Sequence, residues 1–379
     1  MNVAVIGFAF LAMLAMMLIG MPIAVSMAVV GIVGGIAAYG APFMDSIAPV
    51  VWGVQNDSLL TSVPLFVLLG ELLLRSGIAD RMYVALSAWL GRLPGGLLHT
   101  NIGSCALFAA TSGSSVATAA TVGTVALPSL QKRGYPMRAS LGSLAAGGTL
   151  GILIPPSVNM IVYGSLTNNS IGKLFIAGIV MGSLYFGIAT AAESAALGVI
   201  AALAFVWQSG KLSRELLRNC FVSTARVSGM ILLIVAAAFI LNLTVSLTGV
   251  AEAMTKWVAG LGLSATGLIL ALIVFYLILG MFMDVLSMQV ATIPITYPIA
   301  TAIGVDPIWF GIFIVLMCEL GLITPPVGMN LFVVHGIRPD KGGIEDAIYG
   351  ALPYALIMIA FTLLLMAVPQ LVTWLPAHM

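Results

Sequence analysis

Charged residues are scarce in this chain of 379 residues: 7% are Asp, Glu, Lys or Arg, whereas 61% are hydrophobic. A soluble domain carries about 25% charged residues, so this composition cannot build a water-exposed surface. The apolar runs are continuous rather than alternating with polar residues, which favours transmembrane helices over a transmembrane barrel. The stretches long enough to span a bilayer include 3–20, 22–39, 227–247, 264–282 and 351–375.

Cysteine and N-terminal basic residues are also few. The three cysteines are far apart and lack CxxC spacing, so neither a disulfide nor a metal site is predicted. No Lys or Arg precedes Arg75, which argues against a signal peptide. We expect instead a helical hairpin that turns at 19–22. The net charge of +1 gives no indication of nucleic-acid binding.

Two prolines in succession occur twice in apolar sequence, as LGILIPPSVNM at 150–160 and LGLITPPVGMN at 320–330. A shift of 170 residues aligns these stretches and also places Pro128 on Pro298. Because proline removes a backbone donor and clashes with the preceding turn, each pair predicts a broken helix. The common shift predicts two related halves, at 49–166 and 227–336.

The basic residues predict how these halves are oriented. The loops of the first half carry six Lys or Arg residues, whereas the equivalent loops of the second half carry only Lys256. Cytoplasmic loops are enriched in Lys and Arg, so the two halves are expected to be inverted relative to each other. Inverted repeats with broken helices are typical of secondary transporters, which bind substrate and ions near the membrane midplane.

A polar segment precedes each broken helix. The first is SGSS at 112–115, and the shift of 170 places it on FMDV at 282–285. The first has room for two arms of roughly 14 residues, too short to span the bilayer, so re-entrant hairpins are predicted. Hydroxyls, freed carbonyls and the carboxylate of Asp284 suit a hard cation. Helix packing by small residues and a structural hydrogen bond of Asp284 are the alternatives.

The candidate binding residues therefore lie in the hairpin tips and helix breaks. None of these segments contains Lys or Arg, so an anionic substrate would be held by helix N-termini, amides and hydroxyls. Glu319 is expected to support the second break, and we interpret Glu71 and Glu193 as structural. The candidates are Ser112, Gly113, Ser114, Ser115, Pro155, Pro156, Ser157, Asn159, Gly280, Asp284, Ser287, Thr324, Pro325, Pro326, Gly328 and Asn330.

These patterns predict an all-α polytopic membrane protein with an inverted repeat, two re-entrant hairpins and two broken helices. We expect N-terminal scaffold helices at 1–48, an abridged connecting region at 167–226 and a C-terminal scaffold helix at 337–379. The first repeat is expected at 49–166, with a hairpin at 98–131 and a broken helix at 138–165. The second repeat is expected at 227–336, with a hairpin at 264–300 and a broken helix at 307–334.

Several longer motifs resemble those of one family. They include SGSSVATAATVGTVALPSLQKRGY at 112–135, GMFMD at 280–284 and GLITPPVGMNLFV at 321–333. Spread over nearly the whole chain, they resemble the large membrane (permease) subunit of the tripartite ATP-independent periplasmic (TRAP) transporters. The resemblance implies an elevator-type transporter in the bacterial inner membrane. It would couple Na⁺ to uptake of a small organic acid, such as a dicarboxylate, keto acid or sugar acid.

The resemblance also implies partners. A periplasmic substrate-binding protein would deliver the acid, and a small four-helix membrane subunit, here expected as a separate chain, would complete the complex. Na⁺ would be the coupling ion, with no other metal or cofactor and no enzymatic activity. In the family pattern the tips and breaks supply the sodium and substrate sites, which here are Ser112–Ser115, Pro155–Ser157, Gly280–Asp284 and Thr324–Gly328.

One departure from the family lies between KLFIAGIVMGS at 173–183 and YFGIATAAES at 185–194, where the family has a longer stretch. The missing part contains an amphipathic arm and the ends of two membrane helices. A single crossing at about 189–207, with 171–188 not spanning, keeps the two halves inverted.

Two other functions fit parts of the sequence. A stand-alone symporter for sodium and a carboxylate, or another anion, would need no binding protein. An intramembrane serine hydrolase would use Ser114 or Ser115 as nucleophile and His335 or His99 as base. A nucleophile needs an adjacent base that a third group orients, and neither histidine has an evident one in the sequence.

Overall fold

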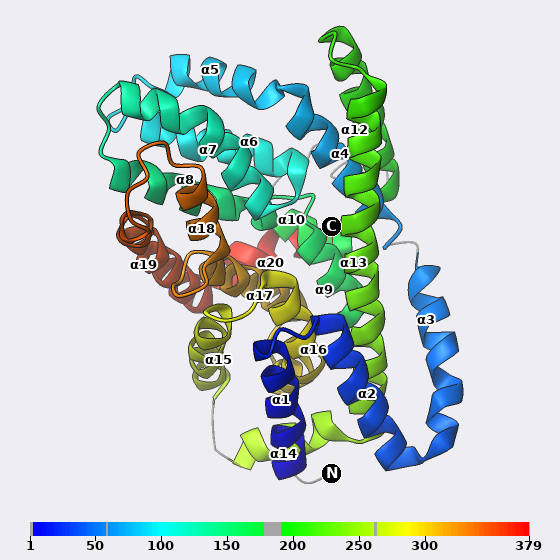
Figure 1. Ribbon diagram of the computed structural model, residues 1–379. Coiled ribbons are helices and arrows are strands. Elements are labelled where there is room, and N and C mark those ends of the chain that lie inside the picture. The colour runs from blue at the N-terminus through cyan, green and yellow to red at the C-terminus, as the bar shows by residue number, and fades with distance from the viewer. Residues whose placement is uncertain (1–2, 58–59, 178–190, 261–263, 379) are drawn as a thin grey trace.

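The computed structural model describes residues 3–57, 60–177, 191–260 and 264–378, which form helices joined by turns, with no strand among them (Figure 1). The longest helix, α13 (Arg214–Leu247), runs along one side of the molecule. Helix α2 (Ile23–Tyr39) packs along it, and the Thr244 hydroxyl donates to the Gly31 carbonyl at 2.7 Å. Helix α4 (Ser62–Ser76) packs against both α13 and α12 (Ala191–Gln208).

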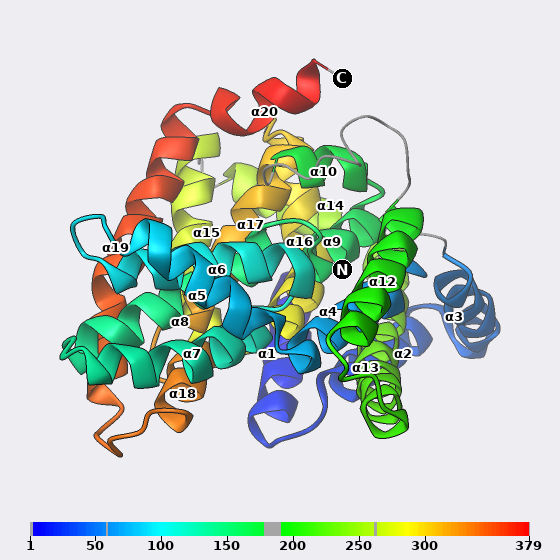
Figure 2. The same cartoon turned by 90° about the horizontal axis from the view of Figure 1, so that it is seen from above.

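The N-terminal helices form the predicted hairpin. Helix α1 (Val3–Leu18) is followed by a turn at 19–22, where Gly20 has φ +92°, and then by α2. A short 3-10 helix, η1 (Ala41–Ser46), leads into α3 (Ile47–Gln55). Seen from above, α3 lies at one edge of the molecule and the C-terminal α19 at the opposite edge (Figure 2).

The first half forms a compact group of helices around α8. Helices α6 (Leu97–Ser112) and α7 (Ser115–Lys132) occupy the predicted first hairpin, and both pack against α8 (Met137–Leu153). Helix α9 (Val158–Thr167) continues after a break, bent by 40° from α8. Helices α5 (Ile78–Leu90) and α10 (Ile171–Ala177) complete this part.

The second half repeats the order of hairpin and broken helix. After α14 (Val250–Gly260), the hairpin consists of α15 (Ala265–Gly280) and α16 (Val285–Ala302). The broken helix consists of α17 (Pro307–Leu322) and α18 (Met329–Gly336). The halves contact each other directly, since α9 packs on α16, and α8 packs on α17 and α18.

The hairpin arms are longer than predicted. They have 16 residues in α6 and α15 and 18 in α7 and α16. Eighteen residues rise about 27 Å, close to the hydrocarbon thickness of roughly 30 Å. Among the described helices, three can cross a membrane by length and composition, α13, α16 and α19, or up to five if each bent pair counts as one span.

The C-terminal part is not one helix, which corrects the predicted run at 351–375 and the single scaffold helix at 337–379. A loop precedes α19 (Glu345–Ala367), and α20 (Gln370–Ala377) follows a break. Val368 leaves helical geometry at φ −131° and ψ 73°, and Pro369 after it has no amide hydrogen to donate. Helix α20 then packs on α10 and α17.

Two predicted boundaries fall inside helices rather than between them. The boundary at 48/49 lies within α3, and the boundary at 226/227 lies within α13. The basic residues Arg214, Arg218 and Arg226 lie in the first part of α13 and a long apolar run follows, but the helix continues through that change. A change of composition therefore marks a change of surroundings here, not the end of an element.

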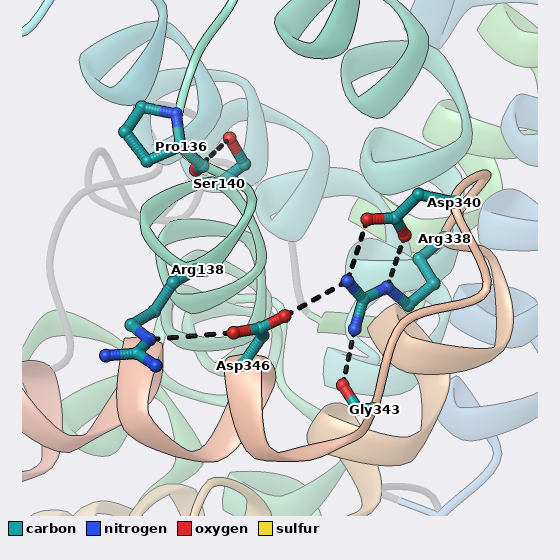
Figure 3. A network of polar contacts seen from close by, with 7 residues as sticks. All are labelled: Pro136, Arg138, Ser140, Arg338, Asp340, Gly343 and Asp346. Atoms are coloured by element: carbon teal, nitrogen blue, oxygen red, sulfur yellow. Dashed lines mark hydrogen bonds and ion pairs between the residues drawn. The ribbon is translucent and has the colours of Figure 1, made fainter.

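The buried Arg338 joins the loop before α19 to the start of that helix, and Asp346 of α19 contacts the first half. The Arg338 guanidinium donates to Asp340 at 2.6 and 2.9 Å, to Asp346 at 3.2 Å, and to the Gly343 carbonyl (Figure 3). Arg138 of α8 lies 3.6 Å from the same Asp346. The hydrogen bond from Arg338 lowers the pKa of Asp340, so this carboxylate stays ionised at neutral pH.

Candidate functional site

The tip of the first hairpin rests on the first helix break. Gly113 has φ +61°, and a Cβ there would lie 2.8 Å from the Pro156 carbonyl oxygen, so only glycine fits. Ser114 is extended and caps α7, its hydroxyl accepting from the Ala117 amide at 3.4 Å. The Ser115 hydroxyl donates to the Thr149 carbonyl of α8 at 2.9 Å. These contacts fix the tip against α8 and α9.

The tip of the second hairpin has the same construction. Asp284 caps α16, with Oδ2 accepting from the Ser287 amide at 3.2 Å and Oδ1 accepting from the Ser287 hydroxyl. A shift of 170 residues places Ser114 on Asp284, so the two equivalent residues begin equivalent helices. The sequence repeat is therefore also a repeat of local structure at these two caps.

Equivalent glycines lie beneath the two tips. A Cβ on Gly151 of α8 would lie 2.5 Å from the Ser115 amide nitrogen, and a Cβ on Gly321 of α17 would lie 3.0 Å from the Gly280 Cα. Gly151 and Gly321 are themselves 170 residues apart. Each hairpin thus approaches its broken helix backbone to backbone, which places the tips next to the breaks.

The two breaks differ in exposure. Pro155, Pro156 and Ser157 are buried, and Ser157 caps α9 by accepting from the Met160 amide at 3.3 Å. In the second break Pro326 is exposed, and Gly328 precedes α18 without a side-chain cap. Each break leaves backbone amides and carbonyls without helical partners. In a membrane such groups are tolerated only where protein or water in a cavity forms hydrogen bonds with them.

A cavity of about 420 Å³ lies between these tips and breaks, and we call it the central cavity. Helices α4 and α13 form its other wall, through residues such as Val67 and Met230. The first residues of four helices line it: Val116 of α7, Val158 of α9, Val285 of α16 and Met329 of α18. Helix N-termini carry partial positive charge, so four such ends gather around one space.

Six of the predicted residues line the central cavity, and ten do not. The lining contains Ser112, Gly113, Ser114, Ser115, Asn159 and Asp284. The remaining candidates lie outside the lining, namely Pro155, Pro156, Ser157, Gly280, Ser287, Thr324, Pro325, Pro326, Gly328 and Asn330. The second break reaches the cavity through its neighbours Leu322 and Met329.

Asn330 and Glu319 face the protein interior instead. The Asn330 amide donates to the Ala145 carbonyl of α8 at 3.0 Å, which joins α18 to the first half. Glu319 of α17 is buried outside the cavity lining, and its Oε1 has no hydrogen-bond partner among the described residues. No hydrogen bond among the described residues joins Glu319 to the second break, so its predicted support of that break stays a prediction.

Asn159 lines the central cavity and carries a side-chain donor that no described residue accepts. Its backbone carbonyl accepts from the Gln289 amide of α16 at 2.7 Å, which joins the two halves at the cavity wall. Its own Nδ2 has no partner among the described residues, and the side chain is only 4% exposed. A buried amide donor without a partner costs roughly 1–3 kcal/mol, so a ligand that accepts its hydrogen bond would be favoured.

The charges of the lining are both negative. The Asp284 carboxylate receives hydrogen bonds only from Ser287 among the described residues. Glu71, interpreted from the sequence as structural, also lines the cavity. It is held by Arg75 at 3.0 Å and by the Ser223 hydroxyl of α13 at 2.6 Å. The sequence did not indicate Glu71 as a cavity residue, because its i,i+4 spacing from Arg75 is typical of a surface ion pair.

The serine hydrolase alternative lacks its geometry. The described bonds of Ser114 and Ser115 go to the Ala117 amide and the Thr149 carbonyl. His99 bonds to the Pro94 carbonyl at 2.6 Å, and His335 lies near the end of α18, outside the cavity lining. A nucleophile and its base must be within hydrogen-bond reach, and the described contacts place neither histidine there.

The comparisons with known proteins agree with this architecture. The family described as "Tripartite ATP-independent periplasmic transporter, DctM component" matches residues 10–192 and 180–371. A C4-dicarboxylate TRAP transporter large permease protein from Rhodobacter capsulatus is 30% identical, with 96% of this chain and 97% of the relative covered. The chain belongs to the DctM family of TRAP transporter large permeases. It is thus a multi-pass protein of the bacterial inner membrane.

Other relatives of this permease carry different substrate names. An isethionate TRAP transporter permease protein from Oleidesulfovibrio alaskensis is 30% identical, with 94% of this chain and 64% of that protein covered. An ectoine TRAP transporter large permease from Halomonas elongata is 27% identical, with 96% and 97% covered. The relatives are named as transport proteins, and large permeases of this family work with a binding protein and a small subunit.

The fold alone is shared with a more distant solved structure. The YdaH transporter of Alcanivorax borkumensis, described as having an unusual topology, has a TM-score of 0.65 at 14% identity. The similarity covers 90% of each chain.

The permease is shorter than its relative. The alignment with the Rhodobacter protein runs over 431 positions, more than the 379 residues present, so the permease lacks residues that the relative has. The two ranges that match the family overlap at residues 180–192. The shortened stretch predicted between 173 and 194 falls largely on 178–190, which lies outside the described residues.

Proposed function

We propose that this permease couples the entry of Na⁺ to uptake of a small organic acid of the dicarboxylate, keto-acid or sugar-acid type. The observation that carries the proposal is the central cavity itself. Among the described residues, four helix N-termini and two carboxylates, but no Lys or Arg, line one space between two hairpin tips and two helix breaks. Such a space suits an anion and a cation that bind together.

The anion would be held by backbone ends and amides. One helix N-terminus favours a negative charge by typically 0.3–1 kcal/mol, so four ends contribute about 1–4 kcal/mol. Asn159 Nδ2 adds a donor that no described residue uses. The tip hydroxyls of Ser112 and Ser114 lie in the same lining.

The two carboxylates make binding of an anion depend on a cation. Asp284 and Glu71 would repel a bound carboxylate in a cavity whose walls are mostly apolar. Glu71 is compensated by Arg75, whereas Asp284 has no basic partner among the described residues. A hard monovalent cation at Asp284 removes the repulsion, which gives the physical reason for coupling.

The relatives support the solute class and the partners. Their names include C4-dicarboxylate, isethionate and 2,3-diketo-L-gulonate transporters. We propose that a periplasmic binding protein delivers the acid and that a small four-helix membrane subunit is a separate chain. We also propose that the two halves are inverted in the membrane and that the site crosses it by an elevator movement, which the repeated tips and breaks support.

Uptake into liposomes tests the proposal. The permease, its small subunit and its binding protein are reconstituted, and uptake of radiolabelled succinate, a 2-keto acid and a sugar acid is measured. Uptake of at least one acid should require an inward Na⁺ gradient, persist without ATP and stop when K⁺ replaces Na⁺. Equal uptake without the binding protein would instead favour a stand-alone symporter. Uptake of every transported acid in the absence of Na⁺ would contradict the proposal.

A further inference from the structure

A second cavity reaches Asp284 from the other side of the hairpin tip. It has a volume of about 310 Å³ and lies between the α1–α2 turn and the α15–α16 tip, and we call it the tip cavity. Asp284 lines both cavities, whereas Ser287 lines only the tip cavity. The α1–α2 side is formed by Leu14, Met17, Leu18, Met21 and Ile23.

We propose that the tip cavity is the entry path of the coupling cation to Asp284, separate from the central cavity that takes the acid. This inference rests on the proposed function, because it assigns a route to the ion that the function requires. It adds that the two solutes reach the hairpin tip from opposite sides.

The ligand set at the end of the tip cavity suits a small cation. Ser287 donates to both carboxylate oxygens of Asp284, through its amide to Oδ2 and through its hydroxyl to Oδ1. A carboxylate has about four acceptor positions, so about two remain open. The Ser287 hydroxyl keeps its own lone pairs, and this side chain is only 2% exposed. Asp284 and Ser287 both line the cavity and together carry three hard oxygens close to one another.

Electrostatics select the sign of the occupant. In the part of the chain that the structure describes, Asp284 is the only charged residue that lines the tip cavity, and apart from Ser287 the rest of the lining consists of Met, Leu, Ile and Phe side chains. Low-dielectric walls focus the field of a single charge, so the cavity attracts cations and excludes the organic acid. The central cavity differs, because four helix N-termini oppose its carboxylates there.

The shape and size favour water and an ion over a lipid chain. A volume of 310 Å³ is far above the roughly 10–15 Å³ that one water requires. An acyl chain would match the apolar walls but would leave the carboxylate of Asp284 facing hydrocarbon. Burial of a charge in hydrocarbon is costly, so the walls and their single charge fit a hydrated path better.

Cysteine accessibility tests this route. All three native cysteines are buried, so a Met21→Cys variant introduces an accessible thiol at the mouth of the tip cavity. Phe8→Cys is the matched control, because Phe8 is 74% exposed on α1 but does not line the cavity. Both variants are assembled with the small subunit and binding protein in vesicles of both orientations. They are treated with a cationic or an anionic methanethiosulfonate.

The cationic reagent should modify Met21→Cys about tenfold or more faster than the anionic reagent, since the field of Asp284 steers it. Phe8→Cys should react with neither. After modification of Met21→Cys, the Na⁺ concentration for half-maximal uptake should rise several-fold, while the acid concentration for half-maximal uptake in saturating Na⁺ stays unchanged. Leu18→Cys provides a second position on the same wall if Met21→Cys fails to assemble.

Three outcomes would overturn the inference. Met21→Cys and Leu18→Cys could be as unreactive as Phe8→Cys, as expected if lipid fills the cavity. Modification could leave the Na⁺ dependence unchanged, or could alter the affinity for the acid equally. Failure of the proposed function is distinguishable, because uptake by the unmodified protein would then show no dependence on Na⁺ at all.

Discussion

At the scale of single residues, one structural role is filled by different side chains in the two halves. Ser114 and Asp284 are 170 residues apart, and each caps the second arm of a hairpin beside a cavity wall. A serine cap is neutral, whereas an aspartate cap brings a charge. The two hairpin tips thus have the same backbone structure but differ in charge. Only the second tip carries a carboxylate, so only this tip is expected to bind the cation through a charged side chain.

Replacement of Asp284 by Asn removes the charge and keeps a side chain that can cap α16. We expect the Na⁺ concentration for half-maximal uptake to rise at least about tenfold, equivalent to ~1.4 kcal/mol. Asp306→Asn is the matched control, because Asp306 caps α17 by accepting from the Trp309 amide at 2.8 Å away from the cavity. Similar Na⁺ dependence in the two variants would remove Asp284 from the cation site.

Replacement of Asn159 by Leu removes the unused donor at nearly constant volume. The affinity for the acid should fall about 10- to 100-fold, since a hydrogen bond to a charged group is worth roughly 1.5–3 kcal/mol. The dependence on Na⁺ should change little. Asn330→Leu serves as control, because that amide bonds to Ala145 outside the cavity and its loss should lower stability instead. Uptake is measured at a series of acid concentrations in both variants. An unchanged acid concentration for half-maximal uptake in Asn159→Leu would contradict the proposed contact between Asn159 and the acid.

At the scale of helices, the sequence predicts breaks better than it predicts continuity. Two consecutive prolines interrupt a helix at 155–156 and again at 325–326. Single prolines do so only in some places, since Pro128, Pro298 and Pro353 lie inside helices, whereas a break precedes Pro369. Neighbouring helices can satisfy the carbonyl that one proline leaves free, so only packing decides the outcome. For the same reason the break before Pro369 and the uninterrupted length of α13 could not be predicted from composition.

The site was predictable only in part, for a similar reason. Polar residues in apolar sequence indicated the tips, and the proline pairs indicated the breaks. The opposite wall could not be found, because Val67 and Met230 look like ordinary membrane-facing residues and Glu71 looks like half of an ion pair. Which side chains turn toward a cavity depends on how helices distant in sequence pack, and no local pattern records that.

The backbone of the first hairpin tip lies very close to Gly151 of α8, and this contact can be tested by mutation. Gly151→Ala would place a methyl group 2.5 Å from the Ser115 amide nitrogen, so α7 or α8 must shift. Overpacking of this kind costs about 1–3 kcal/mol, and the tip should move enough to abolish most uptake. Gly229→Ala in α13 is the control, because no atom lies within 4 Å of the added methyl. Thermal unfolding and uptake of both variants provide the test, and normal uptake by Gly151→Ala would contradict the predicted contact.

At the scale of the whole molecule, a few polar contacts join parts that are far apart in sequence. Gln289 bonds to Asn159, Asn330 bonds to Ala145, and Asp346 meets both Arg138 and Arg338. The first two contacts join the first half to the second half, and the contact of Arg138 with Asp346 joins the first half to α19. Glycines reinforce them, since a Cβ on Gly142 of α8 would lie 2.0 Å from the Gly350 carbonyl oxygen of α19. The two hairpins and their breaks therefore belong to one packed body.

Replacement of Arg338 by Leu tests the polar network in Figure 3. The change leaves Asp340, Asp346 and the Gly343 carbonyl without their buried donor. The net contribution of one hydrogen bond to stability is about 0.5–1.5 kcal/mol, and the variant loses several at once, so the midpoint of thermal unfolding should fall by several degrees. The exposed Arg92 provides the control, and Arg92→Leu should leave the midpoint nearly unchanged. Equal stability of the two variants would show that the network does not stabilise the loop before α19.

Protection of a cysteine in the central cavity tests most directly whether acid and cation meet there. Ala120→Cys places a thiol in the lining on α7, and its modification by an anionic methanethiosulfonate is timed in the reconstituted complex. Succinate, or whichever acid the complex transports, should slow this reaction strongly when Na⁺ is present and little when K⁺ replaces it. A reaction rate that is the same with and without the acid in Na⁺, or equal protection in K⁺, would contradict a shared site for the two solutes.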